Sequence, residues 1–560
     1  MKKIYIIALI SFITVNIFGQ TPTKYWVQFS DKGNNPYSFS NPSAYLGPRA
    51  LARRAAHSIP LDSLDLPVTP AYVAGVAAVP NVSIHSKSKW LNGVVIFTSD
   101  TNALTAIAAL PYVTSVGNVG LRRGNVTSGK LDEAVEAINE NALRSGSISS
   151  STLNYGASYN QINMLGGVCL HNAGFRGQGM QIAIIDAGFY NANNLPVFDT
   201  LFLNNRILGT WDFVMNEASV YEDNSHGSMV LSCMGGNLPG QLVGTAPDAS
   251  FWLLRSEDAP TENIVEEYYW SCAAEFADSA GADVINSSLG YNEFDDPSNN
   301  HTYADMNGHT TPCSRAANYA TRKGMAVVVS AGNSGQSPWF YIGCPADADS
   351  ALTVAATDAS GAVTGFSSRG SLTLFGHQKP DVGAQGEQSV VCDPFGTGIQ
   401  TGNGTSFSSP IMCGLVTCLW QAHPSFNSVQ ILDEIRQSAS QSAAPDSLLG
   451  YGIPDFCAAN LYLNGNPLEL GNADELYNVL PNPFGENLDF SFFSLADQNL
   501  SVMLFDIEGR QIVDQLVFAS GNAENHYRLG ELGAVDSGIY FLRVKTESGK
   551  YFTVKVVKGK

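Results

Sequence analysis

Residues 325–333 read Met-Ala-Val-Val-Val-Ser-Ala-Gly-Asn, an almost unbroken apolar run that stops at a glycine and an asparagine. Similar apolar runs occur at Ile182–Ile185, Phe251–Leu254 and Val284–Asn286, and patterns typical of helices separate them. Strands that are apolar on both faces and joined by helices are typical of a parallel sheet covered on both sides. We therefore predict an α/β domain over residues 154–463, built on a doubly wound, mainly parallel sheet.

The segment ahead of this domain follows a different order. Residues 21–118 contain a strand at Tyr25–Phe29, a helix at Arg49–Ala55, two strands, a second helix and a last strand. This βαββαβ order predicts a ferredoxin-like α+β domain. Residues 119–153 are rich in Ser, Gly and Asn, which predicts a linker, with a helical pattern at Leu131–Arg144 inside it.

The segment after the α/β domain is rich in strands again. A short linker at residues 464–475 leads into residues 476–560, which hold runs such as Leu488–Phe492, Gly538–Lys545 and Tyr551–Val557 between turn residues. Short strands at this spacing predict a small antiparallel all-β sandwich.

The first twenty residues have the features of a signal peptide. Lys2 and Lys3 precede the apolar run Ile4–Phe18, and Gly19 offers a cleavage point. A transmembrane anchor is the weaker alternative, because a bilayer needs about 20 apolar residues. No later segment reaches that length without charges or prolines. We therefore expect export, with no transmembrane segment after signal removal.

Charge and cysteine spacing argue against two kinds of binding site. Acidic residues outnumber basic ones 50 to 30, and the resulting formal charge of −20 would repel a phosphate backbone, which argues against nucleic acid as a partner. The nine cysteines include no Cys-X-X-Cys pair, which argues against a zinc site. Their odd number leaves at least one thiol unpaired, and we assign no pairing. Cys413 and Cys418 lie in an apolar helical stretch and are expected to be small core residues.

Four polar residues stand where predicted elements end or begin. Asp186 and Asn333 follow apolar strands, His226 precedes an apolar helical run, and Ser406 begins the apolar helix Phe407–Trp420. Parallel sheets bind their ligands at the carboxyl ends of the strands. A serine activated by a histidine, which a carboxylate orients, together with amide donors for the oxyanion, carries out acyl transfer. Taken singly, each residue has an ordinary alternative: a loop aspartate, a surface histidine, a turn asparagine or a helix-cap serine.

As a set, these residues and their surroundings resemble the subtilisin-like (subtilase) serine peptidases over about residues 154–463. The motifs that carry the resemblance are Ile185-Asp186-Ala187-Gly188, His226-Gly227-Ser228, Gly244-Thr245-Ala246-Pro247, Ser287-Ser288-Leu289-Gly290, Ala331-Gly332-Asn333, Phe366-Ser367-Ser368-Arg369-Gly370, Lys379-Pro380-Asp381-Val382 and Gly404-Thr405-Ser406.

The resemblance implies a role for each matched residue. Asp186 would orient the histidine, His226 would act as general base and then acid, Ser406 would be the nucleophile and Asn333 an oxyanion donor. It also implies that extended substrate pairs with Ser288, Leu289 and Gly290 as an edge strand, and that the pocket walls include these residues with Ala331 and Gly332.

The flanking segments also resemble known parts. Residues 21–118 resemble a subtilase inhibitor propeptide, with a ferredoxin-like interaction module as the alternative. The C-terminal segment, with Leu480-Pro481-Asn482-Pro483-Phe484 and Ser537-Gly538-Ile539-Tyr540-Phe541, resembles the type A sorting domain of the type IX secretion system. An adhesive or carbohydrate-binding sandwich is the alternative there.

The sequence therefore predicts a secreted serine endopeptidase that is made as a zymogen and exported through the periplasm. Its expected partners are protein or peptide substrates, its own propeptide and the secretion machinery. The mechanism requires no cofactor, and no metal ligands are assigned. Asp295, Asp296 and Asp305 fit a structural calcium ion, common in the family, and equally a solvated acidic loop. The alternatives are a catalytically silent surface adhesin and an esterase or lipase, the latter disfavoured because the Gly-X-Ser-X-Gly elbow is missing.

Overall fold

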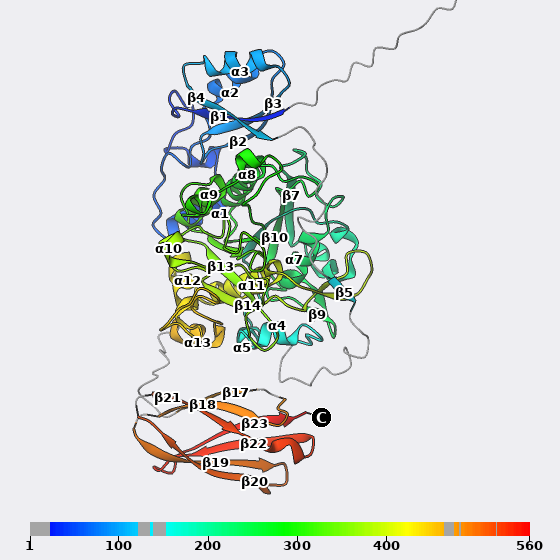
Figure 1. Cartoon of the computed structure of the whole chain (residues 1–560), viewed down its shortest axis with the longest axis vertical. Coiled ribbons are helices and arrows are strands. Elements are labelled where there is room, and N and C mark those ends of the chain that lie inside the picture. The colour runs from blue at the N-terminus through cyan, green and yellow to red at the C-terminus, as the bar shows by residue number, and fades with distance from the viewer. Residues whose placement is uncertain are drawn as a thin grey trace, which may run out of the picture.

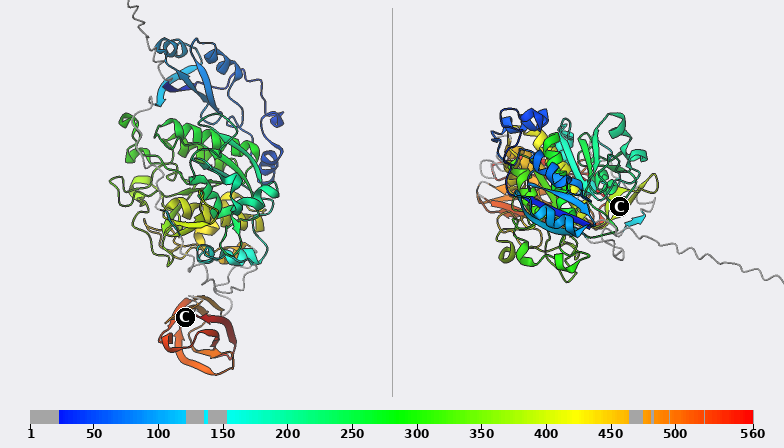
Figure 2. Two further views of the ribbon diagram at one scale, coloured as in Figure 1. Left: turned by 90° about the vertical axis from the view of Figure 1, so that its right-hand side faces the viewer. Right: turned by 90° about the horizontal axis from the view of Figure 1, so that it is seen from above.

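The computed structural model describes residues 23–120, 135–137, 153–463, 475–480, 483–494, 496–521 and 523–559. Figures 1 and 2 show a small α+β unit at one end, an α/β body in the middle and a β-sandwich at the other end. The predicted signal peptide, residues 1–20, lies outside the described residues, as does most of the two predicted linkers.

The α/β body is built on a seven-stranded sheet in which every neighbouring pair is parallel. The strand order is β14-β13-β12-β11-β6-β10-β7. Along the chain these strands are β6 (Gln181–Asp186), β7 (Ile207–Asp212), β10 (Ser250–Arg255), β11 (Val284–Ser287), β12 (Ala326–Ser330), β13 (Leu352–Thr357) and β14 (Val382–Gln385). The predicted doubly wound parallel sheet is confirmed.

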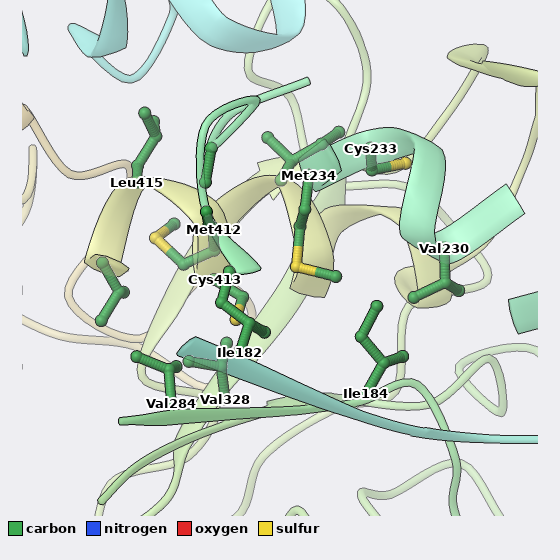
Figure 3. Packing of buried hydrophobic residues seen from close by; sticks show 14 of the residues in the cluster. Ile182, Ile184, Val230, Cys233, Met234, Val284, Val328, Met412, Cys413 and Leu415 are labelled. Carbon is green, nitrogen blue, oxygen red and sulfur yellow. The ribbon is translucent and has the colours of Figure 1, made fainter. Parts of the chain in front are cut away.

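Helices cover both faces of this sheet, and alternate residues of each strand face opposite helices. Ile182, Ile184 and Val328 pack against α7 (His226–Gly235) and α11 (Thr405–Ala422) (Figure 3). The intervening residues, such as Ala183 and Val327, pack under α8 (Val265–Ala280) and α9 (Pro312–Arg322) on the other face. Because helix α11 is buried from Thr405 to Trp420, it forms the centre of the larger core.

The N-terminal unit has the ferredoxin-like arrangement predicted from the sequence. Its antiparallel sheet has the order β2-β3-β1-β4. The strands and helices are β1 (Thr23–Phe29), α2 (Pro70–Ala77), β2 (Ser83–Ser88), β3 (Gly93–Thr98), α3 (Thr101–Ala108) and β4 (Val113–Gly120). Val76 of α2 and Ile107 of α3 enter the small core under this sheet.

The assignment of the first crossover helix was wrong. The Arg/Ala-rich stretch forms α1 (Pro48–Ala56), which does not enter the core of the N-terminal unit; α2 takes that place. Helix α1 instead buries Arg53 and Arg54 against the α/β body. Apart from Leu51, its apolar residues are alanines and a proline, which offer little to a core, whereas the guanidinium groups of Arg53 and Arg54 pair with a carboxylate across the domain boundary.

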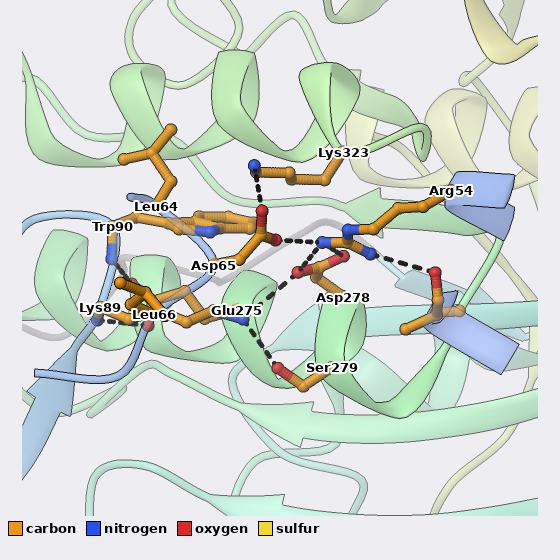
Figure 4. A network of polar contacts seen from close by, with 12 residues as sticks. Arg54, Leu64, Asp65, Leu66, Lys89, Trp90, Glu275, Asp278, Ser279 and Lys323 are labelled. Atoms are coloured by element: carbon orange, nitrogen blue, oxygen red, sulfur yellow. Dashed lines mark hydrogen bonds and ion pairs between the residues drawn. The ribbon is translucent and has the colours of Figure 1, made fainter. Parts of the chain in front are cut away.

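The main partner of these guanidinium groups is Asp278 on α8. Arg53 and Arg54 lie 2.6 Å and 2.9 Å from its carboxylate oxygens, and Lys89 of the N-terminal unit lies 3.3 Å away. A second carboxylate, Asp65, lies 2.7 Å from Arg54 and 2.8 Å from Lys323 of the α/β body (Figure 4). All of these charges are buried, so they pair with one another in place of water.

The helical pattern predicted at Leu131–Arg144 is also wrong where the structure describes it. Residues Val135–Ala137 form the short strand β5, which pairs antiparallel with β16 (Ile399–Gly402). Strand β16 pairs in turn with β15 (Ser389–Cys392). The local pattern of residues indicated a helix. The backbone of these three residues instead pairs with the edge strand β16, and this pairing decides their conformation.

The C-terminal unit is the predicted antiparallel sandwich. One sheet has the order β17-β18-β21 and the other β20-β19-β22-β23 among the described residues. The strands are β17 (Glu475–Leu480), β18 (Leu488–Ser494), β19 (Gln498–Asp506), β20 (Gln511–Ala519), β21 (Ala523–Leu529), β22 (Gly538–Lys545) and β23 (Tyr551–Lys558). Alternate residues of β19 and β22, such as Leu504 and Leu542, are fully buried between the sheets.

One disulfide, Cys169–Cys457, joins α5 (Gly167–Asn172) to α13 (Phe456–Leu463). The other seven cysteines are free and buried, and Cys413 and Cys418 are core residues of α11 as predicted. Among the helices that the structure describes, none is both long and apolar enough to cross a bilayer.

Candidate active site

The four candidate catalytic residues stand at ends of elements of the α/β body. Asp186 is the last residue of β6, His226 is the first residue of α7, and Ser406 is the second residue of α11. Asn333 follows the end of β12 in a turn. Each therefore lies at or beyond the carboxyl edge of the parallel sheet, where such folds bind ligands.

Asp186 and His226 are in direct contact. The Nδ1 atom of His226 lies 2.6 Å from Oδ1 of Asp186, and the two residues are 1% and 0% exposed. The same Asp186 oxygen accepts a hydrogen bond from the backbone N–H of Ala187 at 2.8 Å. In a neutral imidazole this contact favours the tautomer with the proton on Nδ1, which leaves Nε2 as the basic nitrogen.

Two glycines allow the strand end and the helix start to approach this closely. The N–H of Gly227 donates to the carbonyl of Gly188 at 3.0 Å. A Cβ on Gly227 would lie 2.4 Å from that carbonyl oxygen, and Gly188 has φ 143° with Asn224 backbone atoms close by. The Asp-Ala-Gly and His-Gly sequences therefore hold Asp186 and His226 within hydrogen-bonding distance.

Ser406 lies at the amino end of the buried helix α11. Its Oγ lies 3.4 Å from the carbonyl oxygen of Ser288, and the Ser288 hydroxyl donates to the carbonyl of Ser406 at 2.9 Å. The ring of the next residue, Phe407, has its centre 6.4 Å from that of the His226 ring, so the first turns of α11 and α7 adjoin. The N–H groups of a first helical turn have no partner within the helix and can bind an anion.

The side chain of Asn333 is held by Thr405. The backbone N–H and the hydroxyl of Thr405 both donate to Oδ1 of Asn333 at 2.9 Å, and the N–H of Gly332 donates to the Thr405 hydroxyl at 3.0 Å. These contacts occupy the amide oxygen and direct the Nδ2 donors away from Thr405. Sequence analysis quoted Thr405 as part of a motif and missed this role; a hydroxyl directly before Ser406 was the available signal.

A cavity of about 520 Å³ adjoins Ser406 and Asn333. It is lined by the segments 288–293 and 330–334 together with Ser406, so it includes Ser288, Leu289, Gly290, Ala331 and Gly332. Residues 288–290 follow the end of β11 and do not form a strand in the described structure. Asp186 and His226 do not line this cavity.

Sequence analysis missed the acidic lining of this cavity. Glu257, Glu262 and Glu293 line it, and its lining includes no Lys, Arg or His. Glu257 is fully buried and accepts a hydrogen bond from the hydroxyl of Tyr291. Glu257 and Glu262 follow β10 in the chain, far from the recognised motifs, so no local pattern placed them beside Ser406.

The acidic loop considered for calcium has local partners. Asp296 accepts bonds from the N–H and hydroxyl of Ser298, and Asp305 accepts bonds from the N–H and hydroxyl of Thr302. Asp295 accepts a bond from the N–H of Glu262 at 3.1 Å. Each of the three carboxylates therefore has its own hydrogen-bond partner in the loop or beside it. Calcium binding at this loop stays a prediction.

Comparison with known proteins identifies three segments. Residues 177–452 match the subtilase family, residues 24–132 match the peptidase S8 propeptide domain of Bacteroidota, and residues 478–558 match a secretion system C-terminal sorting domain. The propeptide match therefore extends past the predicted boundary at residue 118.

Curated relatives agree with the central match, and one solved structure is also similar to this chain. Subtilisin BL of Lederbergia lenta is 29% identical over 290 residues, which cover 52% of this chain and 93% of that protein. Subtilisin E of Bacillus subtilis (strain 168) is 28% identical over 285 residues, which cover 50% of this chain and 65% of that protein. A crystal structure of MycP1 without its N-terminal propeptide is 25% identical, with a TM-score of 0.43 over 54% of this chain and 96% of that chain. The chain therefore carries a peptidase domain of the subtilase family, between an S8 propeptide domain and a C-terminal secretion sorting domain.

Proposed function

We propose that this chain is a secreted serine endopeptidase, made as a zymogen, with Asp186, His226 and Ser406 as its catalytic triad. The observation that carries the proposal is the buried hydrogen bond of 2.6 Å between His226 Nδ1 and Asp186 Oδ1. His226, held in this tautomer, lies near the start of α11, which carries Ser406. A histidine in this position can act as the base that activates the serine.

The reaction begins when Ser406 Oγ attacks the carbonyl carbon of the peptide bond and its proton passes to Nε2 of His226. Asp186 stabilises the imidazolium that forms. The tetrahedral intermediate then collapses, the C–N bond breaks, and His226 gives the proton to the leaving amine. Water, deprotonated by His226, hydrolyses the acyl-serine and regenerates the hydroxyl.

Negative charge develops on the carbonyl oxygen in both tetrahedral intermediates. The N–H of Ser406, in the first turn of α11, and the Nδ2 group of Asn333 are the proposed donors. Thr405 is proposed to position the second donor, because it binds the opposite end of the Asn333 amide.

The substrate is proposed to bind as an extended strand on both sides of Ser406. Segments 288–290 and 331–332 line the cavity ahead of the cleaved bond and offer backbone groups for pairing. Strand β16, which ends four residues before Ser406, offers an edge for the residues after the cleaved bond.

Strand β5 of this chain already pairs with that edge. Its antiparallel register places Val135 opposite Gly402, at the end of β16 that leads to Ser406, and Ala137 opposite Gln400. We therefore expect self-processing to cut ahead of Val135, after the propeptide strand β4, which ends at Gly120. The propeptide would block the groove until this cut is made.

The acidic lining of the cavity favours substrates with basic side chains. Glu262 is half-buried and Glu257 fully buried at the cavity wall. A lysine or arginine side chain entering there would gain a charge-assisted hydrogen bond, whereas an acidic one would be repelled.

The sorting domain indicates secretion, and the N-terminal signal predicted at residues 1–20 supports passage through the periplasm. We propose that the mature enzyme acts outside the cell on protein or peptide substrates, and that the sorting domain engages the secretion machinery.

Ser406→Ala in the full-length chain tests the proposal. We expect loss of peptide hydrolysis, loss of labelling by a fluorophosphonate, and a chain that keeps its propeptide attached. Ser408→Ala is the matched control, since Ser408 is a buried serine of the same helix whose hydroxyl bonds the Thr405 carbonyl at 3.0 Å.

The two outcomes separate the candidate functions. A wild-type chain that is neither labelled nor active would favour a silent adhesin built on the same fold. Hydrolysis that persists in Ser406→Ala would show that another residue is the nucleophile.

A further inference from the structure

A group of metal-ligating side chains lies apart from the catalytic residues, where α8 and α9 meet two loops of the α/β body. Glu267 comes from α8, Cys313 from the first turn of α9, His301 from the loop between Asn299 and Tyr303, and Cys344 from the segment that precedes β13. Four segments distant in sequence therefore bring two thiols, an imidazole and a carboxylate to one place.

The ligand atoms of these side chains lie close together. Glu267 Oε1 is 2.6 Å from His301 Nε2, and Glu267 Oε2 is 3.4 Å from Cys313 Sγ. The ligand atoms of Glu267, His301 and Cys344 all lie within 4.8 Å of one another. The side chain of Cys344 also interacts with Cys313 and with His301.

The group is buried. Glu267, Cys313 and Cys344 are 0% exposed, and the side chain of His301 is 10% exposed. A position closed to water favours a metal that needs no water ligand, and four protein ligands complete a tetrahedral shell.

The chemistry of the donor set selects the metal. Thiolate sulfur and imidazole nitrogen are preferred by Zn²⁺, whereas Ca²⁺ and Mg²⁺ take oxygen ligands. Zinc bonds of about 2.0–2.3 Å place tetrahedral ligand atoms roughly 3.3–3.8 Å apart. Glu267 Oε1 and His301 Nε2 lie closer than this and would separate on binding, whereas the distance of 3.4 Å between Glu267 Oε2 and Cys313 Sγ lies within the range.

We propose that Glu267, His301, Cys313 and Cys344 bind one zinc ion in a closed, structural site. Sequence analysis argued against zinc because no Cys-X-X-Cys pair is present. That argument applies only to ligands that come in close sequence pairs, and these four come singly from separate segments.

Proton release accompanies binding. Although burial lowers the pKa of His301, contacts with Cys344 and Glu267 outweigh it and raise that pKa to about 11. Burial, followed by the contact with Cys344, raises the pKa of Cys313 well above its usual value. Zinc binds neutral histidine and thiolate sulfur, so zinc binding should release protons and zinc affinity should rise with pH.

A metal bound at this site would stabilise one wall of the substrate cavity. The backbone of Cys344 pairs with that of Tyr291, with N–O distances of 2.8 Å and 3.2 Å. Tyr291 and Gly343 both line the cavity. A metal that fixes Cys344 would therefore fix the position of this wall relative to α8 and α9.

The test uses the full-length chain with Ser406→Ala, so that proteolysis does not affect the protein and no readout depends on activity. We expect one zinc ion per chain by elemental analysis. Removal of zinc with a chelator should lower Tm by several degrees, and added zinc should restore it. Cobalt loading should produce a thiolate-to-cobalt charge-transfer band.

Variants locate the ion. Cys344→Ser and His301→Ala should each lose zinc, the cobalt band and the zinc-dependent Tm shift. The control is Cys418→Ser, which changes another buried free cysteine, in α11, and should keep all three.

Three results would overturn the proposal. One is a Tm of the Ser406→Ala chain that responds to neither chelator nor zinc. Another is full zinc content in both Cys344→Ser and His301→Ala. The third is a Cys313–Cys344 disulfide in the unreduced protein, found by peptide mass spectrometry.

Discussion

Nδ1 of His226 lies 2.6 Å from Oδ1 of Asp186, with both side chains shielded from water. The contact joins the end of a central strand to the start of a helix that packs against that strand. Because the strand and the helix are both parts of the main core, the geometry of the pair is set by the packing of the whole domain.

Asp186→Asn should reduce kcat by on the order of 10⁴-fold with little change in KM. The amide cannot hold the proton on Nδ1 and favours the wrong tautomer of His226. Steady-state hydrolysis of a fluorogenic peptide measures the effect. Asp248→Asn is the control, since Asp248 pairs with the partly exposed Arg206 outside the site. A loss no greater than that of the control would contradict the assigned role.

Asn333→Ala should lower kcat by about 10²- to 10³-fold, because one oxyanion donor is lost. Thr405→Val should cause a smaller loss through the unsupported amide of Asn333, and Thr405→Ser should restore most of it. The kcat and KM of the three variants, measured on one substrate, separate donor from positioning residue. An unchanged kcat in Asn333→Ala would remove Asn333 from the mechanism.

Glu262→Gln should reduce the preference for peptides with arginine or lysine by about fivefold, the value of a partly exposed charge pair on the order of 1 kcal/mol. The ratio of kcat/KM for basic over neutral peptides, measured with a peptide library for the wild-type and the substituted enzyme, gives this preference. Asp295→Asn, a change at a carboxylate beside Glu262 that does not line the cavity, is the control. An unaltered ratio would mean that substrate side chains do not reach Glu262.

Asp278→Ala should destabilise the docking of the propeptide on α8 strongly. Burial alone would raise the pKa of Asp278, but the charges of Lys89, Arg54 and Arg53 outweigh it and lower that pKa to about 2. Removing one member of a buried ion group costs about 3–5 kcal/mol. Asp283→Ala removes the more exposed pair with Arg49 and should weaken docking by under about 1 kcal/mol, since the other side-chain bond of Asp283, from the Gln181 N–H, lies within the α/β body.

Denaturant unfolding of the uncut Ser406→Ala chain compares these two variants. The first transition should move to a clearly lower denaturant concentration for Asp278→Ala than for Asp283→Ala. Equal shifts would show that the Asp278 network does not hold the propeptide.

Docking of the propeptide should weaken as pH falls from 7 toward 5. His85 of β2 lies at the domain boundary, with Nε2 2.8 Å from the Phe213 carbonyl and its ring stacked on Phe97. Burial lowers its pKa, the charge of Lys24 adds to this, and the Phe213 carbonyl and Asp212 oppose it. A histidine with a lowered pKa stabilises the docked state above its free value of about 6.5, and this contribution is lost as pH falls below it.

The pH dependence of Tm for the uncut chain measures this effect. His85→Gln should flatten the curve between pH 7 and 5, because the neutral amide does not titrate. Parallel curves for the two proteins would show that His85 does not contribute.

The sequence by itself determined the fold class of each domain and the identity of the candidate catalytic residues. Apolar strands such as β6 and β12 are encoded locally, since each must be apolar on both faces to lie inside a covered sheet. Asp186, His226, Asn333 and Ser406 could be found because each stands next to the end of an apolar strand or the start of an apolar helix. Short runs of strand-forming residues between turn residues likewise predicted the C-terminal sandwich.

Only the tertiary structure decided features that depend on partners distant in the chain. Helix α1 was misassigned because its arginines are paired with Asp278, more than 200 residues away, and a local pattern contains no information on that partner. Strand β5 replaced an expected helix because an edge strand beside Ser406 supplied its hydrogen bonds. The same reason applies to Glu262 at the cavity wall and to the contact between Cys313 and Cys344. No local pattern predicted these positions, because their neighbours in space come from distant parts of the chain.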